Sequence, residues 1–381
     1  MVAVPAAYPF IEVVIDTSAL QPVAQRSPGV VAIVGASSTG TASASRPLVV
    51  DSAADAVAQF GTGTALSRSL SLALLQDPKP SRLYGVKAGT GDAAGIQAAL
   101  GSLDAADDVN FVALASVTDA TLLGNLKTHV EASSAAGQKR IGVAMVDPAT
   151  AKSATYATDV VTAYDAALRS STSRMVVVAA RGAVTSDGQV ADVASAAAAA
   201  MAGYPPSTSI LLKRVRGVAI PVEQQYSTTE TKALSEAGII PIIQPALIVG
   251  GGFYFGEGRC FTSDASQLYV DIVRTLDDID FRLKAGLIGQ VGEARITRAG
   301  LTTIKSTIEG ILGPLVRAAV IDSFQVAIPV LDVLAIPESA RSAADNNIIT
   351  TARANRSVDM VVTVTYGPAV HRLRVTLQPK F

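Results

Sequence analysis

The sequence is poor in the side chains that build metal and redox sites. Its 381 residues include one cysteine, two histidines and no tryptophan. Because Cys260 stands alone, no intramolecular disulfide can form, which leaves the redox compartment open and favours the cytosol. One cysteine and the distant His129 and His371 cannot supply the clustered ligands of a zinc site. We therefore expect no metal and no cofactor.

Catalytic patterns are missing as well. A Ser-His-Asp or Cys-His site would need one of the two histidines, yet the sequence contains no G-x-S-x-G motif and no histidine near Cys260. Asp277, Asp278 and Asp280 fall in a predicted helix rather than in a calcium-binding loop, and we interpret them as a solvated helix face. We expect no catalytic residues, and the protein is predicted not to be an enzyme.

Charge is scarce too. Charged residues make up 17% of the sequence, against about 25% in typical soluble domains. A net charge of -1 and the lack of any run of five basic residues argue against nucleic acid as a partner. The most apolar segment, residues 239–252, is interrupted by Pro241 and Pro245 and is too short to span a bilayer. The surplus of apolar surface is better explained by burial against copies of the same chain or against a partner.

From residue 29 onwards, short apolar segments alternate with longer helical ones. The predicted strands cover residues 30–34, 48–50, 82–87, 109–114, 141–146 and 174–179. The predicted helices cover residues 52–60, 66–75, 92–100, 119–136, 150–168 and 190–202. This alternation is typical of parallel sheets with helices on both faces. We predict a three-layer α/β domain with a mainly parallel sheet over residues 29–245.

The pattern changes after residue 220. A short helix is predicted over residues 228–237, followed by proline-punctuated strands over 239–249. Residues 266–287 predict a long helix, because apolar residues recur there at spacings of three and four. They are Leu268, Ile272, Leu276, Ile279, Leu283 and Leu287. A helix over 302–316, a strand over 321–328 and a polar loop over 338–347 complete a predicted α+β domain at 246–357.

Both ends of the chain read as strands. The first ten residues lack the basic start and the apolar run of a secretory signal, and residues 10–16 alternate instead. Residues 358–381 contain two more alternating segments. One face of these strands carries Ile11, Val13 and Ile15 at the start, Met360, Val362 and Val364 next, and Leu373, Val375 and Leu377 last. Since a lone hairpin is marginal in water, the arms at 1–28 and 358–381 must join a larger sheet, of their own chain or of a neighbour.

One loop has the glycine spacing of a phosphate-binding site. Gly35 and Gly40 follow an apolar strand, but Thr41 replaces the lysine of a P-loop and no helix begins at once. A plain loop is the preferred interpretation. A nucleotide-dependent α/β enzyme built on this loop is the competing hypothesis.

A sparse basic face leads into the helix predicted over residues 302–316. It consists of Arg295, Arg298 and Lys305, while Glu309 lies on the exposed side of the same helix. Such a face fits an acidic partner as well as it fits ordinary solvent exposure.

Several stretches resemble the contractile tail sheath proteins of phage tails, phage-tail-like bacteriocins and extracellular injection systems. The first is Gly-Val-Val-Ala-Ile-Val-Gly at 29–35, followed by Pro-Leu-Val-Val-Asp and a helix ending in Phe60-Gly61. The second is Gly-Phe-Tyr-Phe-Gly-Glu-Gly-Arg at 252–259, similar to the family's aromatic-Gly-x-Arg-Thr segment. Phe255 replaces the usual tryptophan there and Cys260 the usual threonine. The order and spacing of these stretches cover most of the chain.

The resemblance implies a structural subunit that forms hexameric rings stacked helically around an inner tube and contracts to drive the tube through an envelope. It implies that both terminal arms pair with the inner domains of neighbouring copies. The domain at 246–357 would then be the inner one, with Arg298, Lys305 and Glu309 as candidate tube-facing residues, and the domain at 29–245 the outer one.

The partners that the resemblance implies are further copies of the chain, the inner tube protein, and baseplate and terminal cap proteins. Assembly in the cytoplasm, as part of a phage tail or a phage-tail-like particle, is expected. A static tubular or surface-lattice protein is a further alternative, because it would share the strand exchange but not the contraction.

Overall fold

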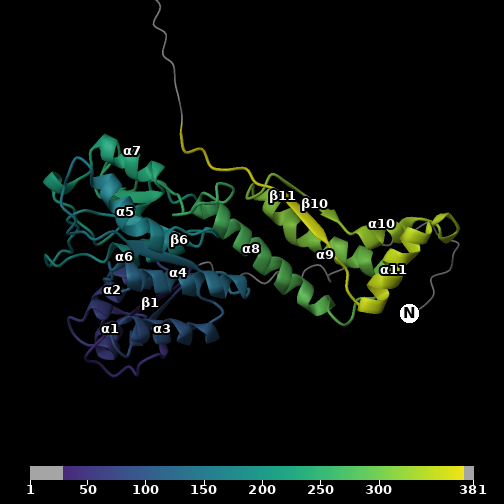
Figure 1. The fold of residues 1–381 in the computed structure, drawn as a ribbon, viewed down its shortest axis with the longest axis horizontal. Coiled ribbons are helices and arrows are strands. Elements are labelled where there is room, and N and C mark those ends of the chain that lie inside the picture. The colour runs from purple at the N-terminus through teal and green to yellow at the C-terminus, as the bar shows by residue number, and fades with distance from the viewer. Residues whose placement is uncertain (1–28, 373–381) are drawn as a thin grey trace, which may run out of the picture. The chain divides into compact units, whose positions relative to one another are not determined.

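The computed structural model describes residues 29–372 of the chain (Figure 1). They fall into two compact units, which divide between Ile279 and Asp280. The large unit contains residues 29–279 and 367–372, and the small unit contains Asp280–Tyr366. Among the helices of residues 29–372, none combines the length and apolar character needed to cross a membrane.

A nine-stranded sheet forms the centre of the large unit, in the order β2-β3-β1-β4-β5-β6-β8-β9-β7. The strands are β1 Val30–Ala36, β2 Pro47–Val49, β3 Arg82–Ala88, β4 Phe111–Leu114, β5 Ile141–Met145, β6 Met175–Ala179, β7 Arg214–Val215, β8 Ile239–Ile243 and β9 Phe253–Phe255. From β3 to β8 in this order, neighbouring strands are parallel. β2, β9 and β7 pair in antiparallel fashion at the two sides. The predicted α/β architecture with a mainly parallel sheet is confirmed.

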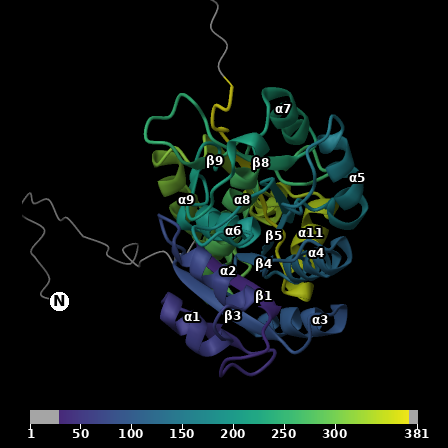
Figure 2. The same ribbon diagram turned by 90° about the vertical axis from the view of Figure 1, so that its left-hand side faces the viewer.

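Helices cover both faces of this sheet (Figure 2). One face carries α1 Ala53–Phe60, α2 Ala65–Leu74 and α6 Val193–Gly203; the other carries α3 Ala93–Gly101, α4 Ala120–Ala135, α5 Tyr156–Leu168 and α7 Thr228–Glu236. This double cover explains why the strands are continuous apolar runs, since both sides of each strand are removed from water. Residues 30–34 of β1 are all at most 1% exposed.

Residues 193–202 of the helix α6 are all buried, and their small, mostly alanine side chains let the helix pack closely against its neighbours. Its start is fixed by Asp192, itself buried, which accepts hydrogen bonds from Ser195 N at 3.0 Å and Ser69 Oγ at 2.6 Å. The carboxylate therefore caps α6 and ties it to α2 at the same time.

The small unit is built around one amphipathic helix. It contains the second half of α8 Val270–Leu287, then α9 Arg298–Arg317, β10 Ser323–Ala327, α10 Pro329–Ala335, α11 Ala343–Asn355 and β11 Val361–Thr365. The buried stripe of α9 consists of Leu301, Ile304, Ile308, Ile311, Leu312 and Leu315. Gly286 lets α8 approach this stripe closely, because a Cβ atom there would lie 2.4 Å from Ile311 Cδ1. The helix predicted over residues 302–316 is confirmed within α9.

The polar loop predicted at 338–347 is wrong, because α11 begins inside it. Asp345 N–H donates to Ser342 Oγ at 3.2 Å and Ser342 N–H donates to Asp345 Oδ2 at 2.8 Å, which is a capping box. The short helix α10 was not predicted either. It starts on Pro329, whose fixed φ suits the first turn of a helix.

The division between the units also differs from the limit at residue 245 drawn from the sequence. β9 continues the sheet of the large unit by pairing with β8. The first half of α8 places Val270 and Val273 in the core of the same unit. Residues 246–279 therefore belong with the α/β sheet.

A buried cation sits beside one of the two histidines. Arg140 is 0% exposed, its Nη1 lies 2.8 Å from His129 Nε2, and its Nη2 donates to Leu103 O at 2.6 Å. Burial, and after it the positive charge of Arg140, lower the pKa of His129 from 6.5 to about 4. His129 is therefore neutral at pH 7 and accepts a hydrogen bond from the guanidinium.

Acid should destabilise the large unit through His129. Because its folded-state pKa lies below that of the unfolded chain, the unfolded state binds the extra proton between pH 6.5 and about 4, and stability falls as the pH falls through this window. We expect this residue to remove about 3 kcal/mol from the free energy of unfolding between pH 7 and pH 4. Urea unfolding at each pH measures this loss. His129→Gln, which keeps an acceptor for Arg140 but does not titrate, should lack it; an identical pH dependence of the two proteins would contradict the assignment.

Candidate assembly surfaces

β10 and β11 form a separate two-stranded antiparallel sheet in the small unit. Phe324 lies opposite Val364, and Val326 lies opposite Val362. These four side chains are half-buried, while the residues that alternate with them are exposed. Within residues 29–372, the outer edge of each strand has no strand beside it. Such edges present unpaired N–H and C=O groups and can accept a strand from another chain.

The structure places only part of the predicted strand arms. Val362 and Val364 lie in β11, and Met360 directly precedes it. β11 pairs with β10 of the same chain. This stretch is therefore bound within its own chain and is not a free arm. The other predicted arm residues lie outside the described residues: Ile11, Val13, Ile15, Leu373, Val375 and Leu377.

Arg298, Lys305 and Glu309 follow one line along α9, because spacings of seven and four residues return to the same helix face. Arg298 and Glu309 are exposed and Lys305 is half-buried. Their line borders the buried apolar stripe of the helix, which leaves Lys305 half-buried. It is therefore a polar surface of the small unit.

A basic corner forms where α9 begins and α11 ends. Arg353 Nε donates to Ile296 O at 3.3 Å, which brings these two helix ends together. Arg295, Arg298, Arg353 and Arg356 are all exposed at this corner. The sequence indicated the first two as part of a basic face. Arg353 and Arg356 were missed because α11 was not predicted: its first five residues fall in the predicted polar loop, and nothing was assigned to residues 348–356.

The first half of α8 is fixed in the large unit by buried charges. Arg174 donates from Nη1 and Nη2 to the two carboxylate oxygens of Asp277, at 2.6 and 2.9 Å, and the two side chains are 9% and 12% exposed. Arg274 is also buried and donates to Tyr204 O at 2.7 Å. The interpretation of Asp277 as part of a solvated face is therefore wrong. The predicted apolar stripe is also interrupted, since Leu276 is 41% exposed.

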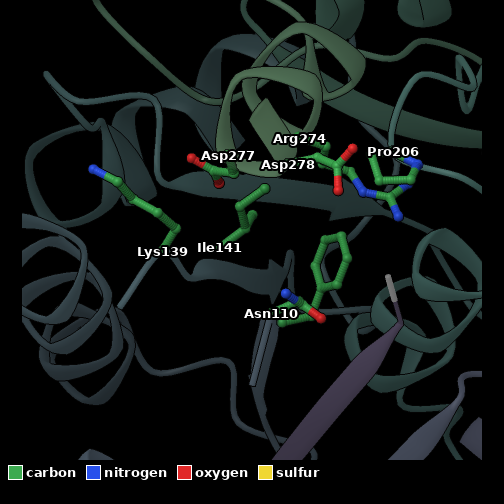
Figure 3. A pocket seen from close by; sticks show the side chains of 8 residues that line it. Asn110, Lys139, Ile141, Pro206, Arg274, Asp277 and Asp278 are labelled. Carbon is green, nitrogen blue, oxygen red and sulfur yellow. The ribbon is translucent and has the colours of Figure 1, made fainter. Parts of the chain in front are cut away.

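Figure 3 shows the small hollow next to these charges, with Arg274, Asp277 and Asp278 on α8 and Asn110 and Ile141 on the sheet side. Its volume is about 30 Å³, roughly the space of one water molecule. Sites for small molecules usually occupy about 300–1,000 Å³. The hollow is therefore a packing feature of the α8 anchor and has no room for a cofactor.

The loop with P-loop-like glycines packs against the wrong end of a helix for phosphate binding. Ala42 N–H donates to Gln59 O at 2.9 Å, and a Cβ atom on Gly40 would lie 2.3 Å from the same oxygen. The loop therefore covers the carbonyl end of α1, which carries partial negative charge and disfavours an anion. This geometry does not support the nucleotide-dependent enzyme.

Cys260 is fully buried, and burial raises the pKa of its thiol to about 12. It therefore packs as an apolar side chain rather than acting as a nucleophile. In the part of the chain that the structure describes, no three His, Cys, Asp or Glu side chains gather in a way that would hold a metal ion.

Breaking the Arg174–Asp277 pair should strongly destabilise the large unit. Asp277→Asn leaves the guanidinium buried without its counter-charge, and we expect a loss of about 3–5 kcal/mol in the free energy of unfolding. Asp280→Asn is the matched control on the same helix. Asp280 pairs with Lys284 at 2.8 Å with both side chains partly exposed, so its loss should be below about 1 kcal/mol.

The same urea titrations should include the double variant Arg174→Met/Asp277→Leu, which replaces the pair by apolar groups of similar size and should regain most of the lost stability. Equal effects of Asp277→Asn and Asp280→Asn would show that the buried pair does not hold α8.

Comparison with solved structures identifies the fold. No family sequence model matches the chain, and no curated protein matches its sequence significantly. The chain is similar to the helical sheath of the anti-feeding prophage in the contracted state, with 14% identity over 99% of both chains and a TM-score of 0.68. It is equally similar to the PVC sheath complex of an extracellular contractile injection system, with 13% identity over 99% of this chain and 98% of the other and a TM-score of 0.69.

A crystal structure gives the same result. The sheath tail protein of Desulfitobacterium hafniense is 14% identical, with 83% of this chain and 93% of the other covered and a TM-score of 0.61. The chain thus has the fold of contractile tail sheath proteins over nearly its whole length. The resemblance drawn from the sequence is confirmed at the level of the fold.

Proposed function

We propose that this chain is the structural subunit of a contractile sheath, which polymerises as stacked hexameric rings around an inner tube and contracts to drive the tube through a target envelope. The observation that carries the proposal is the fold match to a sheath protein over 99% of both chains. The open sheet edges of the small unit supply a physical means of assembly. In this role the chain has no catalytic residues and no cofactor.

Copies would be joined by strand addition to the β10–β11 sheet. Each added strand satisfies edge groups that otherwise face water, at ~0.5–1.5 kcal/mol per hydrogen bond. Apolar residues of the strand would extend the half-buried face of Phe324 and Val364, at roughly 1.5–3 kcal/mol for each fully buried side chain. The segments whose sequence suits this role are residues 10–16 and 373–377. A joint of this kind can persist while the bodies that it connects rotate.

The small unit would face the inner tube and the large unit would face outward. The polar line of Arg298, Lys305 and Glu309 and the adjoining basic corner suit an acidic tube surface, because complementary charge guides and orients a partner without a large apolar interface. The other partners would be baseplate and terminal cap proteins at the ends of the sheath. Assembly would take place in the cytoplasm.

A static tubular or surface-lattice protein, the alternative drawn from the sequence, would use the same strand addition but finds no support among the similar solved structures, which are sheath proteins. Electron microscopy of the native assembly before and after a trigger separates the two functions. A sheath has a long and a short lattice, whereas a static tube has one.

Removing either terminal arm should abolish polymerisation. Variants that lack residues 1–16 or residues 373–381 keep the whole β10–β11 sheet and should stay folded. We expect both to remain unassembled where the full chain forms tubes, as measured by sedimentation velocity and electron microscopy. Thermal unfolding by circular dichroism checks that the units are intact. Long tubes formed by either shortened chain would contradict strand exchange through that arm.

Charge reversal on α9 should weaken binding to the inner tube without affecting the sheath lattice. Arg298→Glu/Lys305→Glu places like charges against an acidic partner, and we expect co-sedimentation with tubes of the inner protein to fall about tenfold or more. Arg317→Glu, an exposed change in the last turn of the same helix, is the control and should have little effect. If the wild type, the double variant and Arg317→Glu all bind the tube equally, Arg298 and Lys305 do not face the tube.

A further inference from the structure

The segment after β11 is fastened to the large unit at one point. Residues 367–370 are exposed, with Val370 at 74%. His371 then enters the surface, so that its side chain is only 14% exposed. The next residue, Arg372, is largely exposed again. Within residues 367–372, the buried part of the contact is therefore the His371 side chain.

The imidazole of His371 fits a slot formed by three side chains. Its Nε2 lies 2.8 Å from Ser209 Oγ. The ring meets Tyr269 edge-on, with centroids 4.8 Å apart and planes at 87°. Its Nδ1 is buried, has no hydrogen-bond partner within residues 29–372, and lies 3.7 Å from Glu257 Oε1. We call the site formed by Ser209, Glu257, Arg259 and Tyr269 the Glu257 notch.

The carboxylate at the base of the notch needs positive neighbours. The Glu257 side chain is 8% exposed and accepts a hydrogen bond from Gly258 N at 2.9 Å. A buried carboxylate is costly unless it is paired. Among the described residues, the guanidinium groups of Arg259 and Arg372 lie 3.7 and 3.9 Å from the carboxylate, and His371 Nδ1 lies 3.7 Å from it. Arg372 and His371 come from the C-terminal segment, so departure of the segment takes one of the two guanidinium groups and the imidazole away from the carboxylate.

The attachment is nevertheless weak enough to be reversible. Arg372 lies 3.9 Å from the Glu257 carboxylate, whereas the buried pair Arg174–Asp277 is bidentate at 2.6 and 2.9 Å. The guanidinium of Arg372 is also solvent-exposed, which reduces the value of its contact. A cavity of about 330 Å³, lined by Lys232 and Glu236 among others, adjoins the segment. Water can therefore reach the contact and replace it.

We propose that the Glu257 notch is a docking site for residues 371–372 of this chain and acts as a latch on the unassembled subunit. Docking holds the start of the C-terminal arm on the large unit and keeps the arm from pairing with stray strands. Release of His371 frees residues 373–377 for a neighbouring copy. The handover to a neighbour rests on the proposed sheath function, whereas the docking itself does not.

Trypsin cleavage after Arg372 tests the docking in the full-length, unassembled chain, because the protease needs the segment to leave the surface. Glu257→Gln removes the charge at the base of the notch, and His371→Ala removes the inserted ring. We expect each variant to be cleaved about tenfold faster than the wild type, since cleavage follows the population of the open form. Each rate is divided by the cleavage rate of a free peptide that covers residues 366–377 of the same variant. This ratio corrects for the effect of a substitution on recognition of the cleavage site by trypsin.

The matched controls are Glu236→Gln in the adjoining cavity, where Glu236 is 61% exposed, and Val370→Ala on the exposed part of the segment. Both should be cleaved at the wild-type rate. His371→Ala leaves the core untouched, so it reports on the latch even if Glu257→Gln impairs folding. Unchanged cleavage of His371→Ala would overturn the proposal, and so would equal acceleration by the control variants.

Measuring tube formation by the same variants tests the latch and the sheath function independently. If His371→Ala is cleaved faster and also forms tubes faster, both proposals gain support. If it is cleaved faster while no variant and no wild-type preparation forms tubes, the latch stands and the sheath function fails. If cleavage is unchanged, the latch is wrong whatever the tubes do.

Discussion

The two units differ in how many backbone N–H and C=O groups are left unpaired at the edges of their sheets. The nine-stranded sheet of the large unit ends in β2 and β7, of three and two residues, so its edges offer few free groups. The β10–β11 sheet consists of two five-residue strands, and each of them is an edge strand within the described chain. Short edges protect a sheet from unwanted pairing, and longer open edges invite it. Within residues 29–372, the small unit therefore offers longer open strand edges than the large unit does.

Charged residues are few, and several of them form buried ion pairs that hold neighbouring elements together. Arg181 is 1% exposed, pairs with Glu230 at 2.8 Å and lies over the rings of Tyr156 and Tyr226, at 4.5 and 4.9 Å from their centroids. Arg181 follows the end of β6 by two residues and thereby connects this strand end to Tyr156 of α5 and Glu230 of α7. Arg174, through Asp277, does the same for α8. Because such groups are costly to bury unpaired, each one fixes the position of the elements that supply its partners.

Much of the large unit could be predicted because its signals are local. Strands such as residues 30–34 are apolar throughout, and helix starts such as Ser52 and Asp119 carry their own caps. The capping box of Ser342 and Asp345 was equally local and was overlooked among polar neighbours. It shows that a polar stretch with a cap and a few apolar residues can still be a helix.

The anchor of α8 could not be predicted in the same way. Asp277 has charged neighbours in the sequence and looks solvated, but its partner Arg174 lies 103 positions away. The Glu257 notch has the same character, because His371 approaches Ser209 from a distance of 162 positions. Contacts between residues so far apart in the sequence depend on the tertiary fold. They produce no periodic pattern in the sequence from which they could be predicted. The proposed role of the strand arms would depend in addition on other copies of the chain, whose contacts a single sequence does not specify.

The burial of Cys260 and the absence of tryptophan have a practical consequence for spectroscopy. Maleimide reagents need an accessible thiolate, which this side chain does not provide. A cysteine introduced on an exposed position would therefore carry a dye alone, and an introduced tryptophan would be the sole indole emitter. Pairs of such probes, one on each unit, would let fluorescence energy transfer follow changes in their separation in real time, with no native tryptophan or accessible cysteine to interfere.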